Sequence, residues 1–354
     1  MQIEYQIIPC QSKKNRISAW ALFFGLFLPV FQFHNPFLLW KKILSSADAQ
    51  LKINRSVASE KAQQKHVVVG FSQIGLDGGW RSAETKSILA EAKKRGIELK
   101  FSDAKGKQEN QFKAIRSFIA EKVNAIILAS LVETGWESVL QEAKDAGIPV
   151  ILVDRGVKVA DSSLYVTSIT ADFVEEGRAA ARWLAISTHC KANIIELQGT
   201  LDSTPAIGRQ AGFAQALKEH PEMKNLKSQS AGFSRQDARE IMQALLKSDG
   251  KNITAVFAHN DEMALGAIEA IEKSGFRPGK DIQLISIDGV RSAFQAIVAG
   301  KLNATVECTP LLGPGIFDAV YKALTHESMV KKMTLQGRIF DVTNAKKAIA
   351  NREY

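Results

Sequence analysis

From His66 onward, short runs of β-branched and apolar residues alternate with segments that have the periodicity of amphipathic helices. The first run is VVVGF at 67–71, and the helix predicted over 80–94 ends before Gly96, a residue typical of C-caps. Short continuous apolar strands that alternate with helices are typical of parallel sheets covered by helices on both faces. About ten such units follow one another, too many for one open sheet of ordinary size. We therefore predict an α/β fold with two doubly wound parallel-sheet lobes; an eight-fold barrel is the alternative.

The segment 156–172 has no clear strand or helix pattern, and this gap favours a boundary between the lobes there. The first 65 residues differ from the rest of the chain. Lys13, Lys14 and Arg16 precede an apolar stretch over 17–33, and Ala47-Asp48-Ala49 offers an A-x-A cleavage site. Residues 1–49 are therefore predicted to be a secretory signal peptide. The alternatives are a retained membrane anchor, since about 20 apolar residues span a bilayer, and an incorrectly assigned start codon.

The basic net charge belongs mainly to this leader. Residues 1–66 hold nine of the 46 Lys and Arg residues but three of the 37 Asp and Glu residues. The polar segment 50–65 is predicted to be a linker, and the body that follows it is nearly neutral. A nucleic-acid-binding domain would show a basic stripe, so we expect no nucleic-acid partner. Cys190 and Cys308, which are 118 positions apart, give no disulfide framework.

Polar and aromatic residues follow nearly every predicted strand, and ligands of doubly wound sheets bind at the carboxyl ends of the strands. These residues are Gln73, Asp77, Trp80, Arg81, Asp103, Asp154, Arg155, Gln198, Asp202, Arg209, Phe233, Asn260, Asp261 and Asp288. Carboxylates accept hydrogen bonds, guanidinium groups donate them, and aromatic rings offer a flat apolar surface. The set therefore favours a neutral polyhydroxylated ligand.

Each of these residues also has an ordinary structural explanation. Asn260 suits an N-cap, Asp154 and Arg155 could form a surface pair, and Trp80 could belong to the core. The sequence contains no phosphate loop, no H-E-x-x-H, no C-x-x-C and no G-x-S-x-G, and its six histidines lack metal-ligand spacing. We therefore expect no metal and no cofactor.

Five motifs resemble those of the periplasmic sugar-binding proteins of ABC importers, in the ribose/galactose-binding group. They are AVFAHNDEMALGA (255–267), VILVDR (150–155), GRQAGFAQAL (208–217), SIDG (286–289) and AGKLNATV (299–306). The resemblance covers about residues 66–354. Four segments are similar to galactofuranose-binding proteins within that group: GFSQIGLDGGWRSAET (70–85), KQENQ (107–111), SITAD (168–172) and IELQGT (195–200).

The resemblance implies the type I periplasmic binding protein fold, with two lobes joined by a three-crossing hinge. The N-terminal lobe would comprise residues 66–170 plus 309–339. The C-terminal lobe would comprise residues 171–308 plus 340–354. The chain departs from the group near the hinge, where Glu307-Cys308 stands at a position that ribose binders fill with Gln.

The resemblance also implies residue roles. Trp80 and Phe233 would stack on a sugar ring, and a polar set would bond its hydroxyl groups: Arg81, Glu84, Asp103, Asp154, Arg155, Arg209, Asn260 and Asp288. The protein would be a monomeric, non-enzymatic receptor in the periplasm. It would bind a monosaccharide, most similar to galactofuranose, and deliver it to a permease with a cytoplasmic ATPase. It would associate with the membrane only through that permease or through a retained leader.

Two other functions remain open from the sequence. A sugar-responsive regulator of the LacI type shares the two-lobe body but needs a helix-turn-helix at its start, where this chain has an apolar leader. A sugar-modifying enzyme could use Asp154 and Glu84 as an acid/base pair.

Overall fold

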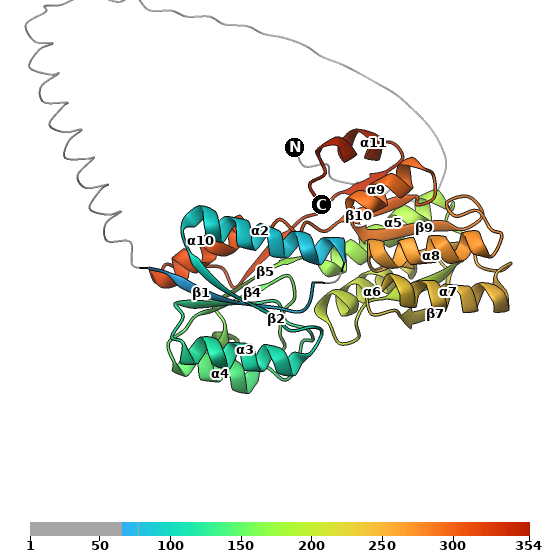
Figure 1. The fold of residues 1–354 in the computed structure, drawn as a ribbon. Helices are drawn as coiled ribbons and strands as arrows, with labels where there is room; N and C mark the ends of the chain where they lie inside the picture. Colours follow the sequence, from blue (N-terminus) through green and yellow to red (C-terminus); the bar gives the residue numbers. More distant parts are fainter. Residues whose placement is uncertain (1–65, 77) are drawn as a thin grey trace, which may run out of the picture. The chain divides into compact units, whose positions relative to one another are not determined.

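The computed structural model describes residues 66–76 and 78–354 (Figure 1). The signal peptide or anchor predicted over 1–49, the linker predicted over 50–65 and the candidate residue Asp77 lie outside the described residues. Among the residues described, no helix is long and apolar enough to cross a membrane.

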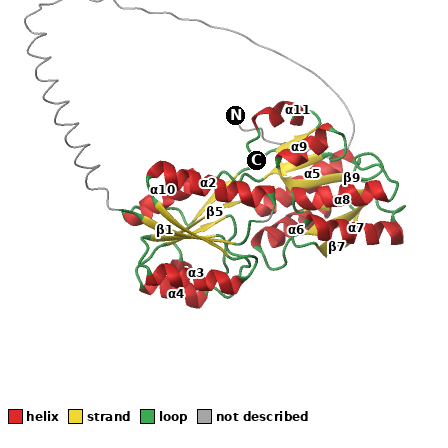
Figure 2. Cartoon of the chain, in the orientation of Figure 1, coloured by secondary structure: helices red, strands yellow, loops and turns green. Residues whose placement is uncertain are grey.

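The first lobe is a six-stranded parallel sheet with the strand order β11-β5-β4-β3-β1-β2. Helices α2 and α10 cover one face of this sheet, and α3 and α4 cover the other (Figures 1 and 2). The elements are β1 (Val68–Gln73), α2 (Gly79–Arg95), β2 (Glu98–Asp103), α3 (Gln108–Ala120), β3 (Ala125–Leu128), α4 (Glu137–Asp145), β4 (Val150–Val153), η1 (Ser162–Leu164), β5 (Thr167–Ala171), α10 (Gly313–Leu324) and β11 (Lys332–Leu335).

The second lobe is a six-stranded sheet with the order β12-β10-β9-β8-β6-β7, in which β12 alone among the described strands is antiparallel to its neighbour. Helix α5 packs along α6, and α7 packs along α8. The elements are α5 (Phe173–Ser187), β6 (Ala192–Gln198), α6 (Thr204–Leu217), β7 (Met223–Ser230), α7 (Arg235–Asp249), β8 (Ala255–Ala258), α8 (Asp261–Lys273), β9 (Gln283–Asp288), α9 (Arg291–Val298), β10 (Ala304–Glu307), β12 (Ile339–Asp341), α11 (Ala345–Ala348) and η2 (Ile349–Asn351).

The chain passes between the lobes three times: from β5 to α5, from β10 to α10, and from β11 to β12. The predicted fold class, two parallel-sheet lobes with a three-crossing hinge, is therefore confirmed and the eight-fold barrel is excluded. The residue limits predicted for the two lobes stay predictions.

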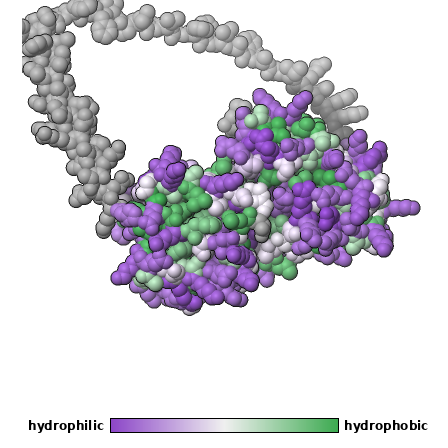
Figure 3. Space-filling model, viewed as in Figure 1, coloured by the Kyte–Doolittle hydropathy of each residue, from purple (hydrophilic) through white to green (hydrophobic). Residues whose placement is uncertain are grey.

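The core of the first lobe explains why its central strands are continuous apolar runs. Every residue of β3 (AIIL) and β4 (VILV) is buried. Ile88 and Phe317 pack on the face beneath α2 and α10, while Phe118 and Trp136 pack on the opposite face. The side chains on both faces of each of these strands are therefore shielded from solvent. Hydrophilic residues instead cover most of the visible surface over α3, α7 and α8 (Figure 3).

The absence of a strand over 156–172 was a wrong prediction, because this segment contains β5. The boundary between the lobes that the segment favoured stays a prediction. This strand reads TSITA, and its polar side chains hide the apolar pattern of a buried strand. Thr167 is fully buried nonetheless. Its hydroxyl donates to the backbone carbonyl of Val330 at 2.8 Å, so the buried polar group has a hydrogen-bond partner. The short strands β11 and β12 also escaped the sequence analysis.

Helices α5 and α6 approach so closely that two glycines are required at their contact. A Cβ atom on Gly177 would lie 2.0 Å from the carbonyl oxygen of Arg209, and one on Gly212 would lie 1.9 Å from that of Val174. Both obstacles are backbone atoms. The contact therefore fixes the position of α6, the helix that carries Arg209.

We expect Gly212→Ala to lower the free energy of unfolding by about 1–3 kcal/mol, the usual cost of forcing extra atoms into a packed interface. Gly315→Ala is the matched control, because a Cβ atom there meets nothing within 4 Å. Urea denaturation of both variants measures the difference. An equal change in the two variants would contradict this account of the α5–α6 contact.

Candidate functional site

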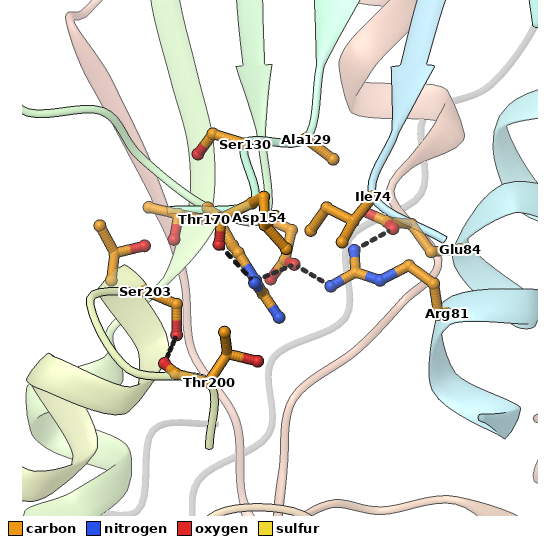
Figure 4. Close-up of polar contacts among 12 residues, drawn as sticks. Ile74, Arg81, Glu84, Ala129, Ser130, Asp154, Thr170, Thr200 and Ser203 are labelled. Atoms are coloured by element: carbon orange, nitrogen blue, oxygen red, sulfur yellow. Dashed lines mark hydrogen bonds and ion pairs between the residues drawn. The ribbon is translucent and has the colours of Figure 1, made fainter. Parts of the chain in front are cut away.

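One arginine joins two carboxylates at the edge of the first lobe. Arg81 and Glu84 lie one turn apart at the start of α2, and Asp154 directly follows β4. The Arg81 guanidinium donates from Nη1 to Glu84 Oε2 at 2.5 Å and from Nη2 to Asp154 Oδ2 at 2.7 Å. Figure 4 shows Arg81 pointing from its helix toward Asp154. The structure therefore brings these three predicted residues together.

Glu84 is completely buried, although it is a carboxylate on an amphipathic helix. Its Oε2 also accepts a hydrogen bond from the Gln73 amide at 3.0 Å. Its Oε1 is buried and has no hydrogen-bond partner among the residues that the structure describes. Burial raises the pKa of Glu84, against the opposing effect of Arg81. Because buried polar atoms nearly always have partners, Oε1 is an available acceptor for a ligand hydroxyl.

Asp154 and Arg155 lie in a turn that closes the carboxyl end of β4. Asp154 has φ = 58°, in the left-handed region that non-glycine residues rarely adopt. Arg155 donates from Nη1 to the Leu131 carbonyl at 2.8 Å. Its buried Nε lies 3.8 Å from Asp154 Oδ2 and has no hydrogen-bond partner within the described chain. Burial, followed by the positive charge of Arg81, lowers the pKa of Arg155 to about 9. The alternative of a plain surface pair is wrong, because both side chains are buried.

Arg209 plays the equivalent part in the second lobe. Its Nε donates to Glu176 Oε2 at 2.8 Å, and its Nη1 donates to the backbone carbonyl of His259 at 2.6 Å. Its Nη2 lies 3.8 Å from Asp288 Oδ1. Burial raises the pKa of both carboxyl groups. Burial alone would lower the pKa of Arg209, but the charge of Glu176 raises it.

Sequence reasoning missed Glu176. It lies in the first turn of α5, immediately after the first crossing between the lobes, and not after a strand. An acidic residue in a first helical turn is ordinarily explained by the helix dipole. The available signal was its position four residues after SITAD, at the predicted boundary between the lobes.

Phe233 and Asn260 stand on neighbouring loops of the second lobe. A Cβ atom on Gly199 would lie 2.0 Å from the Phe233 ring, so the absence of a side chain there makes room for the ring. Asn260 caps α8 by accepting from the backbone N–H of Met263 at 2.9 Å, which confirms the N-cap interpretation. The Arg155 guanidinium of the first lobe lies 5.3 Å from the Phe233 ring centroid, so the two lobes meet at this point.

Trp80 reaches from α2 to the hinge. Its ring is buried against the core of the second lobe, and its Nε1 donates to the Cys308 carbonyl at 2.6 Å. A recess beside it is lined by Asp154 and by residues from all three crossings, among them Ala171 and Gly337. The core interpretation of Trp80 thus holds, and its stacking on a sugar stays a prediction.

The structure gives other polar residues of the sequence analysis local roles. Asp103 ends the edge strand β2, and its Oδ1 accepts from the backbone N–H of Lys105 at 2.9 Å. Gln198 donates to the buried Glu196 at 3.2 Å. The described residues contain no group of three or more His, Cys, Asp or Glu side chains suited to a metal ion.

Asp261 holds the loop that carries Asp288. Its carboxylate accepts hydrogen bonds from the Ser286 and Thr305 hydroxyls at 2.5 and 2.8 Å. It also accepts from the backbone N–H groups of Gly289 and Val290, both at 2.7 Å. Burial is the largest influence and raises the pKa of Asp261 to about 6, against these bonds. The Asp261 carboxylate is therefore occupied by hydrogen bonds that hold this loop.

The two clusters offer a ligand the same kinds of hydrogen-bonding groups. Each holds an arginine between buried carboxylates, so each presents donors and acceptors side by side in surroundings largely shielded from water. The hydroxyl groups of a neutral molecule can donate to Glu84 and Asp154 and accept from Arg155 and Arg209. The Phe233 face adds apolar surface between the lobes.

The comparisons with known proteins point to a single family. The model of the periplasmic binding protein domain matches residues 69–327. The galactofuranose-binding protein YtfQ of Escherichia coli (strain K12) is 47% identical over 302 residues, which are 84% of this chain and 93% of YtfQ.

Two solved structures are similarly close. One is the periplasmic binding protein component of the arabinose ABC transporter from Shewanella sp. ANA-3, bound to α- and β-L-arabinofuranose. It is 48% identical with a TM-score of 0.80, over 81% of this chain and 96% of its own. The other, a galactofuranose-binding protein, is 46% identical with a TM-score of 0.79, over 81% of this chain and 98% of its own.

Asp261→Asn should change how stability depends on pH. The folded protein keeps the Asp261 proton up to about pH 6, whereas the ordinary pKa is 3.8. Between these values the native state binds more protons than the unfolded state, so this group's contribution to stability falls as pH rises. Over that range the free energy of unfolding of the wild type should fall by about 3 kcal/mol relative to the variant, at about 1.36 kcal/mol per pH unit.

Chemical denaturation at a series of pH values from 3 to 7 measures both curves. Glu84 and Glu176 are present in both proteins, and Asp261 is not among the charges that shift their pKa values, so their contributions cancel in the difference. The charge of Asp261 raises the pKa of Asp288, so the wild type also carries the pH dependence of that coupling. Asp145→Asn, an exposed substitution on α4, is the control and should follow the wild type. Parallel curves for the wild type and Asp261→Asn would show that Asp261 does not titrate in this range.

Proposed function

Because this chain belongs to the periplasmic binding protein domain family, we propose that it is the solute-binding protein of an ABC sugar importer. Its ligand is a monosaccharide in the furanose form, similar to galactofuranose or arabinofuranose. The observation that carries this proposal is the pair of arginine–carboxylate clusters, one in each lobe. The names of the related proteins support the same ligand class.

The sugar binds between the clusters and bridges the lobes. Glu84 Oε1 and Arg155 Nε are buried atoms whose hydrogen-bonding capacity the described residues leave unused. A sugar hydroxyl can donate to the first and accept from the second. Hydrogen bonds to charged groups contribute about 1.5–3 kcal/mol each. Asp154, Arg209, Asn260 and Asp288 complete the polar set, and the rings of Trp80 and Phe233 face the C–H surfaces of the sugar.

Closure of the lobes follows from this division of the site. A sugar that contacts both clusters binds the closed form better than the open form, and it shifts the equilibrium by that difference in affinity. The closed, loaded protein then delivers the sugar to a permease with a cytoplasmic ATPase. We place the protein in the periplasm as a monomer, exported through the leader predicted over 1–49.

The contacts of Arg81 favour binding over catalysis. A sugar-modifying enzyme would need one of Asp154 and Glu84 to donate a proton while the other accepts one. Here a single guanidinium donates to both carboxylates, at 2.7 and 2.5 Å. This arrangement uses one oxygen of each carboxylate as an acceptor for the same cation, and it places the two groups in equivalent roles. We therefore expect the sugar to be recovered unchanged after incubation with the protein.

Asp154→Ala should weaken sugar binding far more than it weakens the fold. Removing this carboxylate leaves sugar hydroxyl donors unpaired and leaves Arg81 with one fewer buried counter-charge. The expected loss is about 2–5 kcal/mol of binding free energy, by analogy with buried charged pairs. That corresponds to an increase in Kd of roughly thirtyfold to several thousandfold.

Isothermal titration calorimetry with L-arabinose and D-galactose, whose solutions contain furanose forms, measures the affinities. Melting curves of the same samples report the fold. Asp145→Ala removes an exposed carboxylate from the same lobe and should leave Kd unchanged. Equal affinities for the wild type and Asp154→Ala would remove Asp154 from the site, and a wild type that binds no sugar would contradict the proposed function.

A further inference from the structure

Two hydrogen bonds join the lobes outside the arginine clusters. The backbone N–H of Gly156, in the first lobe, donates to Thr204 Oγ1 of the second lobe at 3.1 Å. The backbone N–H of Glu133, also in the first lobe, donates to the carbonyl oxygen of Asp202 at 2.9 Å. None of these four residues belongs to the set that we propose to touch the sugar. We call this pair of bonds the rim latch.

The first-lobe side of the rim latch is held in place by its own bonds. The Ser130 hydroxyl donates to the Gly156 carbonyl at 2.8 Å. The backbone N–H of Lys158 donates to the Glu133 carbonyl at 2.5 Å, which ties the loop after β3 to the loop after β4. Both bonds lie within the first lobe, so the N–H groups of Gly156 and Glu133 are oriented by contacts that do not involve the second lobe.

The second-lobe side is equally ordered. Thr204 is the first residue of α6, with Pro205 next to it, and the preceding Ser203 donates from its hydroxyl to the Thr200 carbonyl at 2.6 Å. The Thr204 methyl carbon would lie 3.6 Å from a Cβ atom on Gly156, which is ordinary van der Waals contact. Helix α6 also carries Arg209, so the rim latch and a sugar-site cluster move as parts of one element.

We propose that the rim latch raises sugar affinity without touching the sugar, by stabilising the closed form. The inference rests on the proposed function. A bond that exists only when the lobes meet lowers the free energy of the closed state and leaves the open state unchanged. The apparent Kd of a ligand that needs the closed state falls in proportion to that state's population. The closed complex then opens more slowly, so the effect appears in the dissociation rate.

Thr204→Val tests the proposal because it removes the hydroxyl and preserves the shape of the side chain. We expect Kd for L-arabinose to rise about three- to tenfold, the size of one lost hydrogen bond. The increase should lie in the dissociation rate measured by stopped-flow fluorescence. Thr204→Ser keeps the hydroxyl and should retain wild-type rates. Thr325→Val is the control, since its hydroxyl bonds lie at the end of α10, and it should change nothing.

Hydrogen–deuterium exchange of the full chain, with and without saturating L-arabinose, is an independent test. The rim latch forms only when the lobes meet, so in the sugar-bound protein Thr204→Val should speed exchange in the segments containing Gly156 and Glu133, compared with the wild type and Thr204→Ser. A wild type that binds no sugar would contradict the proposed function. A wild type that binds sugar, with equal exchange in these segments or an unchanged dissociation rate in Thr204→Val, would overturn the latch.

Discussion

The site depends on how the partly exposed Arg81 and the buried Arg209 share their charge with buried carboxylates. Removing an ion from water costs several kcal/mol even after the protein relaxes, so Glu84, Asp154, Glu176 and Asp288 need a nearby positive charge. Arg81 supplies it to the first two, and Arg209 supplies it to the second two. Each pairing holds its carboxylates at one lobe's edge. Polar groups that would otherwise be too costly to bury are thereby kept ready for a ligand.

The folds of the two lobes place these clusters opposite each other. In each sheet the carboxyl ends of the parallel strands gather at one edge, where Asp154 follows β4 and Asp288 ends β9. The two lobes are in contact beside these edges, as the approach of the Arg155 guanidinium to the Phe233 ring shows. Helix α6 links this chemistry to closure, because it carries Arg209 in its middle and Thr204 at its start. In our proposal, a ligand at the clusters and the rim latch favour the same arrangement of the lobes.

Much of this was predictable from the residues at strand ends. The rule that ligands bind there identified Arg81, Asp154, Arg209 and Asp288, which the structure assembles into the two clusters. Glu176 was not found, because it follows a hinge crossing and looks like an ordinary first-turn acid. Strand β5 was missed because its buried threonines bond backbone groups and interrupt the apolar pattern. The hydrogen bond from Trp80 to the hinge joins residues 228 positions apart, a pairing that no local pattern contains.

The central claim is that a furanose ring lies between the two arginine–carboxylate clusters and joins the lobes. The most direct test is a crystal structure of the protein grown with L-arabinose. The account predicts an arabinofuranose between Glu84, Asp154 and Arg155 on one side and Arg209 and Asp288 on the other, with its ring against Phe233. A pyranose in this position, or a sugar bound outside the two clusters, would contradict it.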